Sequence, residues 1–386
     1  MHLAVDAVGI KHSGGATVLV DFLAAAAASE QLSKISVFCS PRDSRDFDFP
    51  ANSRLIEIEQ PAAESSRPGR LWWLARGASV AVKRIGADRF LSMNGCSRAL
   101  QVPQITFVQQ SLIFCPEATR LFPISERSAL QTIRWMTRRA CLASDVVFVQ
   151  TPTMKVWVSN QFGIDSSLIQ VFEPTASLSL EPVTSSAQVD LLRTVPIGRR
   201  LLYVGNEMPY KNVISVARAM PAIREQVPGA TLFVTWSDPN ALTGSEGVVS
   251  CGRLRGAALR EAYELADIVV MPSLVETVGL PLLEAMSMAR PVLAADRPYA
   301  RDVCCNSAMY FDPLDSNDFI VKAVEMLRDS DLRCRLGETG NRIVEQRRGS
   351  QPYARMVEAA VNAGSAAMQA ASSSRRSELR QRARES

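Results

Sequence analysis

The sequence predicts an α/β protein built from two doubly wound parallel sheets. Three observations lead to this fold class. Short runs rich in β-branched residues alternate with helical stretches along the chain. Several runs, such as 145–150 and 267–272, are apolar on both faces, which is typical of parallel strands covered by helices on both sides. The chain has 386 residues, more than one hydrophobic core usually organises, so we expect two domains.

The elements follow one another in strand–helix order from the N-terminus. Strands are predicted at 3–8, 34–40, 53–59, 89–93, 105–109, 145–150 and 168–172, and then at 200–205, 230–236, 247–251, 267–272, 291–295 and 308–312. Helices are predicted at 16–31, 71–86, 120–142, 212–226, 257–266, 280–289, 317–329 and 331–347. This order favours two open sheets whose crevices at the carboxyl ends of the strands face one cleft.

A stretch rich in Pro, Ser, Thr and Gly interrupts the strand series and predicts a linker. The expected organisation is an N-terminal Rossmann-like domain over 1–175, a linker over 176–199 and a C-terminal Rossmann-like domain over 200–348. A helix at 349–364 is expected to pack back on the N-terminal domain. A basic, low-complexity tail fills 365–386, and its composition favours disorder over a basic surface helix.

Composition and charge exclude several classes of protein. Hydrophobic residues make up 47% and charged residues 21%, which excludes a disordered or collagen-like chain. No apolar run is long enough to span a membrane, and the N-terminus does not read as a signal peptide, so we expect a cytoplasmic protein. The net charge is +4, with 18 basic against 14 acidic residues in 1–170. This half can rest on anionic lipid headgroups or present an ordinary solvated surface. No basic stripe indicates a nucleic-acid partner.

The segment 266–296 carries the strongest chemical signal. A buried strand ends at Pro272-Ser273, a short loop holds Glu276, and a helix begins near Leu280, with Pro281 in its first turn. The free N–H groups of Val278, Gly279 and Leu280 then lie at the positive end of a helix dipole. Such a helix start is an anion site suited to a diphosphate.

Two carboxylates flank this predicted anion site. Glu276 lies in the loop and Glu284 one turn into the helix. Carboxylates beside a phosphate repel it, but they accept hydrogen bonds well from vicinal hydroxyls of sugars and ribose. The alternative is a loop-capping Glu276 and a solvated Glu284.

These residues resemble a known family. The pair Glu276 and Glu284 inside Pro-Ser-x-x-Glu-x-x-Gly-Leu-Pro-x-x-Glu-Ala-Met resembles the E-x7-E motif of retaining GT-B glycosyltransferases of family 4, the glycosyl transferases group 1. Residues 202–212 look like that family's first C-domain strand and its phosphate-binding turn, and 248–254 look like its nucleobase loop. Leu259, Tyr263 and Asp267, followed by 311–315, continue in the family's order.

The resemblance implies roles for individual residues. Glu276 and Lys211 would be catalytic, with Lys211 and the helix amides taking the charge of the leaving diphosphate. The residues implied to bind the nucleotide-sugar donor are Gly14, Gly15, Asn206, Lys211, Arg253, Leu254, Thr277, Val278, Gly279, Leu280 and Glu284. Asn206 departs from the family, which usually has an arginine there.

The N-terminal half matches the family less fully. Ser13-Gly14-Gly15 looks like the family's glycine loop, although an ordinary tight turn explains it equally well, and the Gly-x-Gly-x-x-Gly pattern of a dehydrogenase is absent. Gln109 and Gln110 stand where the family often has a histidine beside the reacting sugar, so they are assigned to the acceptor side. No histidine follows His12, which excludes a histidine base from that position.

Other features can be interpreted either as purely structural or as functional. Asp46-Phe47-Asp48 matches a metal-binding D-x-D pattern but lies in a polar loop, so we predict no metal site. Trp72, Trp73, Trp135 and Trp157 can stack on lipid or sugar, but their spacing favours packing. Arg134, Arg138 and Arg139 can meet a pyrophosphate-lipid acceptor or form a solvated helix face.

The resemblance therefore implies a retaining hexosyltransferase that needs no metal or other cofactor. The donor would be a nucleoside-diphosphate sugar. The acceptor would be a polyprenyl-diphosphate-linked glycan in O-antigen, lipopolysaccharide or exopolysaccharide assembly, reached by a cytoplasmic enzyme at the periphery of the membrane. The alternatives are a sugar-nucleotide epimerase or hydrolase of the same fold, and a binding subunit without catalysis.

Overall fold

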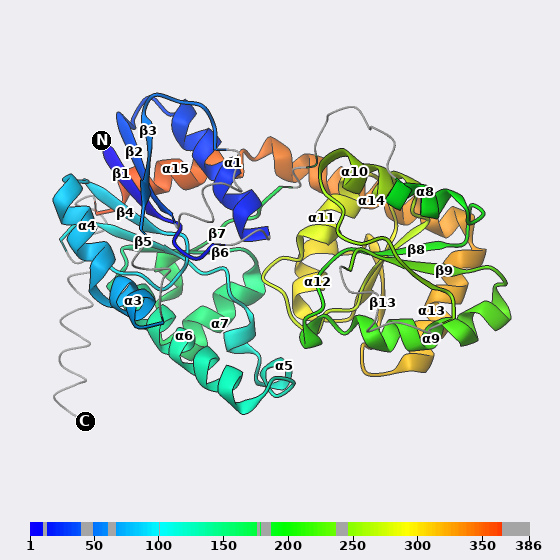
Figure 1. Ribbon diagram of the computed structural model, residues 1–386. Helices are drawn as coiled ribbons and strands as arrows, with labels where there is room; N and C mark the ends of the chain where they lie inside the picture. Colours follow the sequence, from blue (N-terminus) through cyan, green and yellow to red (C-terminus); the bar gives the residue numbers. More distant parts are fainter. Residues whose placement is uncertain are drawn as a thin grey trace. The chain divides into compact units, whose positions relative to one another are not determined.

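The computed structural model describes residues 1–10, 14–39, 49–60, 67–99, 101–175, 178, 187–236 and 246–364. The chain forms two compact units (Figure 1). Unit 1 comprises Met1–Phe114, Ser125–Pro174 and Gln351–Ser386, and unit 2 comprises Cys115–Ile124 and Thr175–Ser350. The tail at 365–386, the His12 and Ser13 positions and the Asp46–Asp48 motif lie outside the described residues.

Unit 1 is built on a seven-stranded parallel sheet with the order β3-β2-β1-β4-β5-β6-β7. Its strands are β1 (His2–Asp6), β2 (Lys34–Cys39), β3 (Leu55–Glu59), β4 (Arg89–Ser92), β5 (Gln104–Phe107), β6 (Val146–Val149) and β7 (Ile169–Val171). The strand order reverses between β1 and β4, which are paired neighbours. The sheet continues with β2 and β3 on the β1 side and with β5, β6 and β7 on the β4 side. In such sheets the crevice for ligands lies at the carboxyl ends of these two strands.

The helices of unit 1 cover this sheet. They are α1 (Gly14–Ala28), α3 (Arg67–Trp72), the π-helical turn η1 (Trp73–Gly77), α4 (Ala78–Ile85), the 3-10 turn η2 (Leu112–Phe114), α6 (Ile124–Ala143), α7 (Pro152–Phe162), the 3-10 turn η3 (Ser166–Leu168) and α15 (Pro352–Asn362). Met356, Val357 and Ala360 of α15 are buried in one core cluster with Phe22 of α1. Helix α15 therefore completes the core of the unit that the first residues began.

Unit 2 contains a six-stranded parallel sheet with the order β10-β9-β8-β11-β12-β13. Its strands are β8 (Arg200–Tyr203), β9 (Thr231–Val234), β10 (Val248–Ser250), β11 (Ile268–Met271), β12 (Val292–Ala295) and β13 (Ala308–Phe311). Strands β8 and β11 are the neighbours at which the order reverses. The loops that follow them define the ligand crevice of this sheet.

Helices lie on both sides of the unit 2 sheet. They are α8 (Ala187–Arg193), the 3-10 turn η4 (Pro209–Lys211), α9 (Val213–Gln226), α10 (Gly256–Leu265), α11 (Leu280–Ser287), α12 (Pro298–Cys304), α13 (Ser316–Arg328) and α14 (Ser330–Gly349), and unit 2 also includes the short helix α5 (Pro116–Thr119). Two core clusters, one on each face of the sheet, use alternate residues of β8, with Leu202 in one cluster and Leu201 and Tyr203 in the other.

The fold class predicted from the sequence is confirmed, since both sheets are parallel and doubly wound. Each predicted strand is present within a few residues of its expected bounds. The interval 176–199, expected as a linker, contains the helix α8. This helix buries Val189 and Leu192 in the core of unit 2, and its apolar spacing offsets the Pro- and Ser-rich composition around it. Helices α5, α7 and α12 were not among the predicted elements.

Candidate functional site

A lysine and a glutamate meet at the strand-order reversal of unit 2. Lys211 ends the η4 turn after β8, and Glu276 lies in the loop after β11. The Nζ atom of Lys211 is 2.5 Å from Oε1 of Glu276. The two loops are also joined through the backbone, because the N–H of Leu274 donates to the carbonyl of Tyr210 at 2.8 Å. The topology thus brings together two residues 65 positions apart in the sequence.

This ion pair is largely shielded from water. The Lys211 and Glu276 side chains are 14% and 12% exposed. Burial alone would lower the pKa of Lys211, but the charge of Glu276 and its hydrogen bond outweigh burial and raise that pKa. Lys211 is therefore a stable cation that can hold an anion and cannot serve as a base near neutral pH.

Three tyrosines surround the pair. Burial raises the pKa of Tyr203, Tyr210 and Tyr299, and the charge of Glu276 raises each of them further. They remain neutral hydroxyls. Tyr203 donates to the carbonyl of Asn206 at 3.0 Å, and Tyr299 donates to the carbonyl of Ser273 at 3.0 Å. These two hydrogen bonds hold the start of each site loop.

A glycine in the left-handed region opens helix α11. Gly279 has φ 72° and is the N-cap residue, and no side chain caps the helix. A Cβ atom at this position would lie 3.2 Å from Cε of Met271. The first-turn amides of α11, close in sequence to Glu276, are consequently not covered by a capping side chain, which leaves a place for an anion.

Glu284 lies in the second turn of α11 and has a different partner. The hydroxyl of Tyr263, on α10, donates to Oε2 of Glu284 at 2.6 Å. Burial raises the pKa of Glu284, and the hydrogen bond from Tyr263 acts in the opposite direction. The Glu284 carboxylate is thus held by the hydroxyl of Tyr263, and the Glu276 carboxylate is held by the ammonium group of Lys211.

The other residues assigned from the sequence lie at separate positions. In unit 2, Thr277 and Leu280 are partly exposed, Val278 and Leu254 are buried, and Arg253 is exposed on the loop after β10. In unit 1, Gly14 and Gly15 begin α1, Gln109 donates from Nε2 to the carbonyl of Met93 at 3.1 Å, and Gln110 is exposed.

Unit 1 has a buried carboxylate at the corresponding strand-order reversal. Asp6 ends β1 and is fully buried. It accepts hydrogen bonds from Nε1 of Trp73, from Nδ2 of Asn94 and from the N–H of Val8. Burial raises the pKa of Asp6, and these hydrogen bonds partly offset that effect. Asp6 could not be predicted as a candidate from the sequence, because a single aspartate at a strand end has no distinguishing pattern.

The residues that the structure describes contain no group of three or more His, Cys, Asp or Glu side chains arranged to hold a metal ion. Within the same residues, no helix is both long enough and apolar enough to cross a membrane.

The comparison with known families concerns the unit that carries Lys211 and Glu276. Residues 198–329 match the Glycosyl transferases group 1 family. This group 1 domain contains η4, the loop after β11 and helix α11, and therefore the whole of the site described above in unit 2.

Curated relatives match the chain only in part. The sulfoquinovosyl transferase SQD2 of Arabidopsis thaliana is 35% identical over 138 residues, which are 33% of this chain and 27% of SQD2. The O-antigen chain mannosyltransferase RfbU of Salmonella typhimurium is 24% identical over 46% of this chain and 50% of RfbU. The chain thus spans between a quarter and a half of the length of these two relatives.

Solved structures match nearly the whole chain at low identity. Sucrose-phosphate synthase from Thermosynechococcus elongatus has a TM-score of 0.72, with 16% identity over 93% of this chain and 98% of its own. WaaG, a glycosyltransferase involved in lipopolysaccharide biosynthesis, has a TM-score of 0.71, with 16% identity over 94% and 100%. HepE of Anabaena in complex with UDP and glucose has a TM-score of 0.66, with 16% identity over 93% and 98%. Together with the two parallel sheets, these similarities confirm the GT-B fold.

Proposed function

We propose that this protein is a retaining glycosyltransferase that moves a hexose from a nucleoside-diphosphate sugar to a hydroxyl group. The observation that carries the proposal is the shielded Lys211–Glu276 pair at the strand-order reversal of the group 1 domain. Two relatives are named as sulfoquinovosyl and mannosyl transferases, and the HepE structure holds UDP and glucose, which supports a nucleotide-sugar donor here.

The proposed mechanism divides the developing charges between the two residues. As the bond between the anomeric carbon and the phosphate oxygen breaks, negative charge collects on the diphosphate and positive charge on the sugar ring. Lys211 and the first-turn amides of α11 stabilise the negative charge on the diphosphate. Glu276 stabilises the positive charge on the sugar ring and orients the sugar hydroxyls. The ammonium group of Lys211 has three N–H donors, so it can hold Glu276 and a phosphate oxygen at once.

The acceptor's proton needs a destination in this mechanism. Lys211 stays protonated and the nearby tyrosines stay neutral, because the pKa of each of these groups is raised. We therefore assign the proton to the leaving phosphate oxygen, while the acceptor oxygen bonds to the anomeric carbon on the face that the phosphate leaves. This arrangement retains the anomeric configuration and uses no metal, so activity should survive EDTA.

Glu276→Gln tests this proposal because it keeps the shape of the side chain and removes its charge. We expect transfer to fall by about 10²–10³-fold, the usual effect of losing one group that stabilises transition-state charge. The matched control is Glu246→Gln, which alters an exposed glutamate of the same unit. Undiminished transfer by a folded Glu276→Gln variant would contradict the proposal, as would release of free sugar by the wild type with no transfer to any acceptor.

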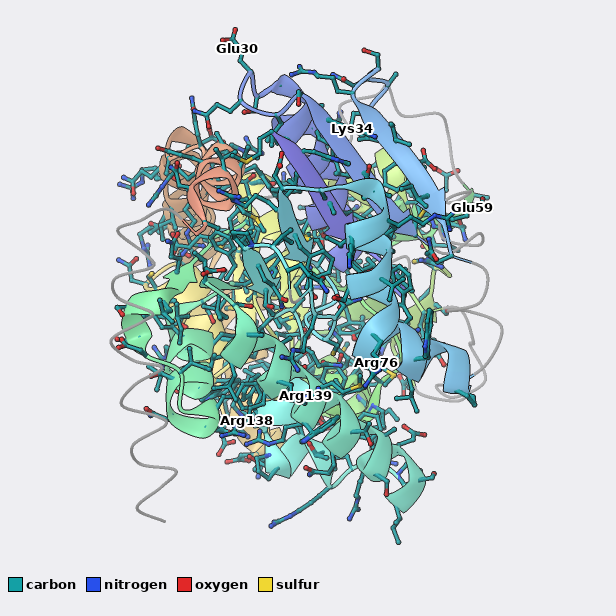
Figure 2. The ribbon with its side chains drawn as sticks, turned by 90° about the vertical axis from the view of Figure 1, so that its left-hand side faces the viewer. Glu30, Lys34, Glu59, Arg76, Arg138 and Arg139 are labelled. Atoms are coloured by element: carbon teal, nitrogen blue, oxygen red, sulfur yellow. The ribbon has the colours of Figure 1, made fainter. Side chains whose placement is uncertain are left out.

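The proposed acceptor is a lipid-linked glycan, and one face of unit 1 suits a membrane. Residues 67–85 and 127–143 hold nine Lys and Arg and no Asp or Glu. On α3, Trp72 is 54% exposed, and on α6, Trp135 is 56% exposed. The guanidinium of Arg139 lies 4.5 Å from the ring centre of Trp135. Figure 2 labels Arg76, on η1, and Arg138 and Arg139, on α6. We call Trp72, Arg76, Trp135, Arg138 and Arg139 the basic–aromatic face.

Indole rings and arginines occur together where proteins meet the headgroup region of a bilayer. We propose that the basic–aromatic face rests on an anionic bilayer and so brings the enzyme to its acceptor. Arg134 takes no part, since its guanidinium donates to the carbonyl of Ile113 and to Oε1 of Gln161.

Sedimentation with vesicles tests this proposal. The wild type should sediment with vesicles that contain phosphatidylglycerol and not with neutral phosphatidylcholine vesicles. Arg138→Glu/Arg139→Glu should abolish sedimentation, whereas Arg335→Glu/Arg342→Glu, which changes the same number of charges on α14, should not. Equal loss in both double variants would contradict a specific face.

A further inference from the structure

Glu284, which the resemblance assigns to donor binding, has a buried hydrogen-bond partner in Tyr263. The side chain of Tyr263 is fully buried, and its hydroxyl donates to Oε2 of Glu284 at 2.6 Å. Glu284 itself is partly exposed. Within the part of the chain that the structure describes, this is the one hydrogen bond found for the Glu284 carboxylate. One carboxylate oxygen is thus held from the interior, and the other has its acceptor sites available.

The position of the Tyr263 hydroxyl is fixed by packing. Tyr263 belongs to the core cluster on one face of the unit 2 sheet, together with Leu282 and Leu283 of α11 and Ala262 of its own helix. Helix α10 precedes β11 and α11 follows it, so the tyrosine joins two helices beside the strand that leads to Glu276. A buried phenol needs a hydrogen-bond acceptor, and here its acceptor is a glutamate.

The contact also favours the charged form of Glu284. Burial raises the pKa of both Tyr263 and Glu284, and the Tyr263 hydrogen bond counteracts the effect on the glutamate. A carboxylate is an acceptor at both oxygens, whereas a protonated carboxyl group presents a donor at one of them. The contact with Tyr263 thus keeps an acceptor available on the exposed side of Glu284.

We propose that Tyr263 is a positioning residue that makes this site select ribonucleotides. By holding Oε2 of Glu284, Tyr263 fixes the carboxylate so that Oε1 accepts a hydrogen bond from a ribose hydroxyl of the nucleotide. This inference rests on the proposed function, in which the group 1 domain binds a nucleoside-diphosphate sugar. It assigns to Tyr263 an effect on ribose recognition that acts through Glu284.

Titration calorimetry with two ligands tests this assignment. UDP, GDP and ADP are first screened against the wild type, and the diphosphate that binds is compared with its 2′,3′-dideoxy analogue. We expect Tyr263→Phe to weaken binding of the ribonucleotide about tenfold, the size expected for losing a hydrogen bond to a charged group. Binding of the dideoxy analogue should stay within about twofold of the wild-type value. In the Glu284→Gln background, Tyr263→Phe should have no further effect.

The pH dependence supplies a readout that a merely structural role would not change. Without the Tyr263 hydroxyl the pKa of Glu284 should rise further, so the carboxylate becomes protonated at a higher pH. The ratio of dissociation constants between Tyr263→Phe and wild type should therefore grow as the pH falls from 8 to 6. Taking the ratio cancels the titration of the nucleotide phosphate, which is common to both proteins.

The outcomes separate this inference from the proposed function. Tyr310→Phe is the matched control, because its hydroxyl donates to the carbonyl of Cys305 and not to α11. Equal loss of affinity for both ligands in Tyr263→Phe, or wild-type affinity for both, would overturn the role of Tyr263. If no nucleoside diphosphate binds the wild type, the proposed function itself fails.

Discussion

At the scale of single residues, the Lys211–Glu276 pair illustrates that a site can be stable only while both partners are present. Each charge is shielded from water and is balanced by the other at 2.5 Å. Removing one partner leaves the other as an uncompensated charge, which is costly, whereas removing both exchanges the pair for neutral groups. The ion pair thus also links the stability of the two loops that carry Lys211 and Glu276.

This leads to a prediction for three variants of the pair. Lys211→Met should lower the free energy of unfolding by about 3 kcal/mol, and the double variant Lys211→Met/Glu276→Gln should recover part of that loss. Because the pKa of Lys211 is raised above 10.5 in the folded state, its contribution is complete below pH 10.5 and is lost as the pH rises through the higher folded value. Urea denaturation at pH 7 and 9 should therefore give the same ranking. A double variant less stable than Lys211→Met would contradict this account.

A second prediction concerns Asp6 in unit 1. Asp6→Asn turns an N–H group toward donors such as Nδ2 of Asn94 and Nε1 of Trp73, and it should cost about 1–3 kcal/mol. The raised pKa means that folded wild type takes up a proton at a higher pH than the unfolded chain. The contribution of Asp6 to the free energy of unfolding of the wild type therefore increases as the pH falls toward its raised pKa. The difference in unfolding free energy between wild type and Asp6→Asn should grow accordingly. Denaturation of both proteins at pH 7 and pH 5 measures this difference in free energy. A smaller difference at pH 5 than at pH 7 would refute the prediction.

The loop and helix that carry the candidate residues could be predicted from the sequence, but the contacts among those residues could not. The spacing of Glu276 and Glu284, with Gly279 and Pro281 between them, predicted a loop followed by a helix start, and the structure has the start of α11 there. The roles inferred for the site residues stay predictions. The bond from Tyr263 to Glu284 joins two helices on either side of β11, so it depends on a packing that no local pattern encodes.

At the scale of elements, the start of α11 depends on one glycine, and a matched pair of variants tests this dependence. Gly279 and Gly163, the C-cap of α7, have φ values of 72° and 70°. A Cβ atom would lie 3.2 Å from Met271 at position 279 and would meet nothing within 4 Å at position 163. Both Gly→Ala variants should lose about 1 kcal/mol from backbone strain. Only Gly279→Ala should also weaken nucleotide binding, measured by calorimetry. Equal binding by both variants would show that the helix start tolerates the shift.

The strands were easier to predict than the shorter helices. Continuous apolar runs between turn residues indicate buried parallel strands, and the thirteen strand predictions rest on that signal. The missed helices α7 and α12 each begin with a proline after an extended residue, and Thr151 caps α7 by accepting from the N–H of Met154. Both start signals are therefore present in the sequence itself.

No local signal of this kind predicts the π-helical turn η1. Helix α3 ends at Trp72, which is 54% exposed, and η1 begins at Trp73, which is 2% exposed and donates to Asp6. The sequence alone favoured packing for both indoles. The buried carboxylate of Asp6, which comes from a distant strand, provides the acceptor that Trp73 needs inside the fold.

At the scale of the whole molecule, unit 1 is completed by a helix from the far end of the described chain. Met356 of α15 is 1% exposed and lies in the cluster that contains Phe22. Met356→Ala should lower the stability of unit 1 by about 2–4 kcal/mol, and Glu358→Ala, one half-turn away and exposed, should leave it unchanged. Tryptophan fluorescence follows the transition, because Trp72, Trp73, Trp135 and Trp157 lie in unit 1 and only Trp236 lies in unit 2. Equal stability of the two variants would contradict a structural role for α15.

The path of the chain also sets the order in which the protein can mature on the ribosome. Unit 2 ends at Ser350, and the part of unit 1 that contains α15 begins only at Gln351. Domains generally fold as they are synthesised. The nascent chain can therefore finish the group 1 domain while the first domain to emerge still exposes the apolar side of α1. Translation that stops before α15 would yield a folded unit 2 attached to an incomplete unit 1, a natural target for chaperones.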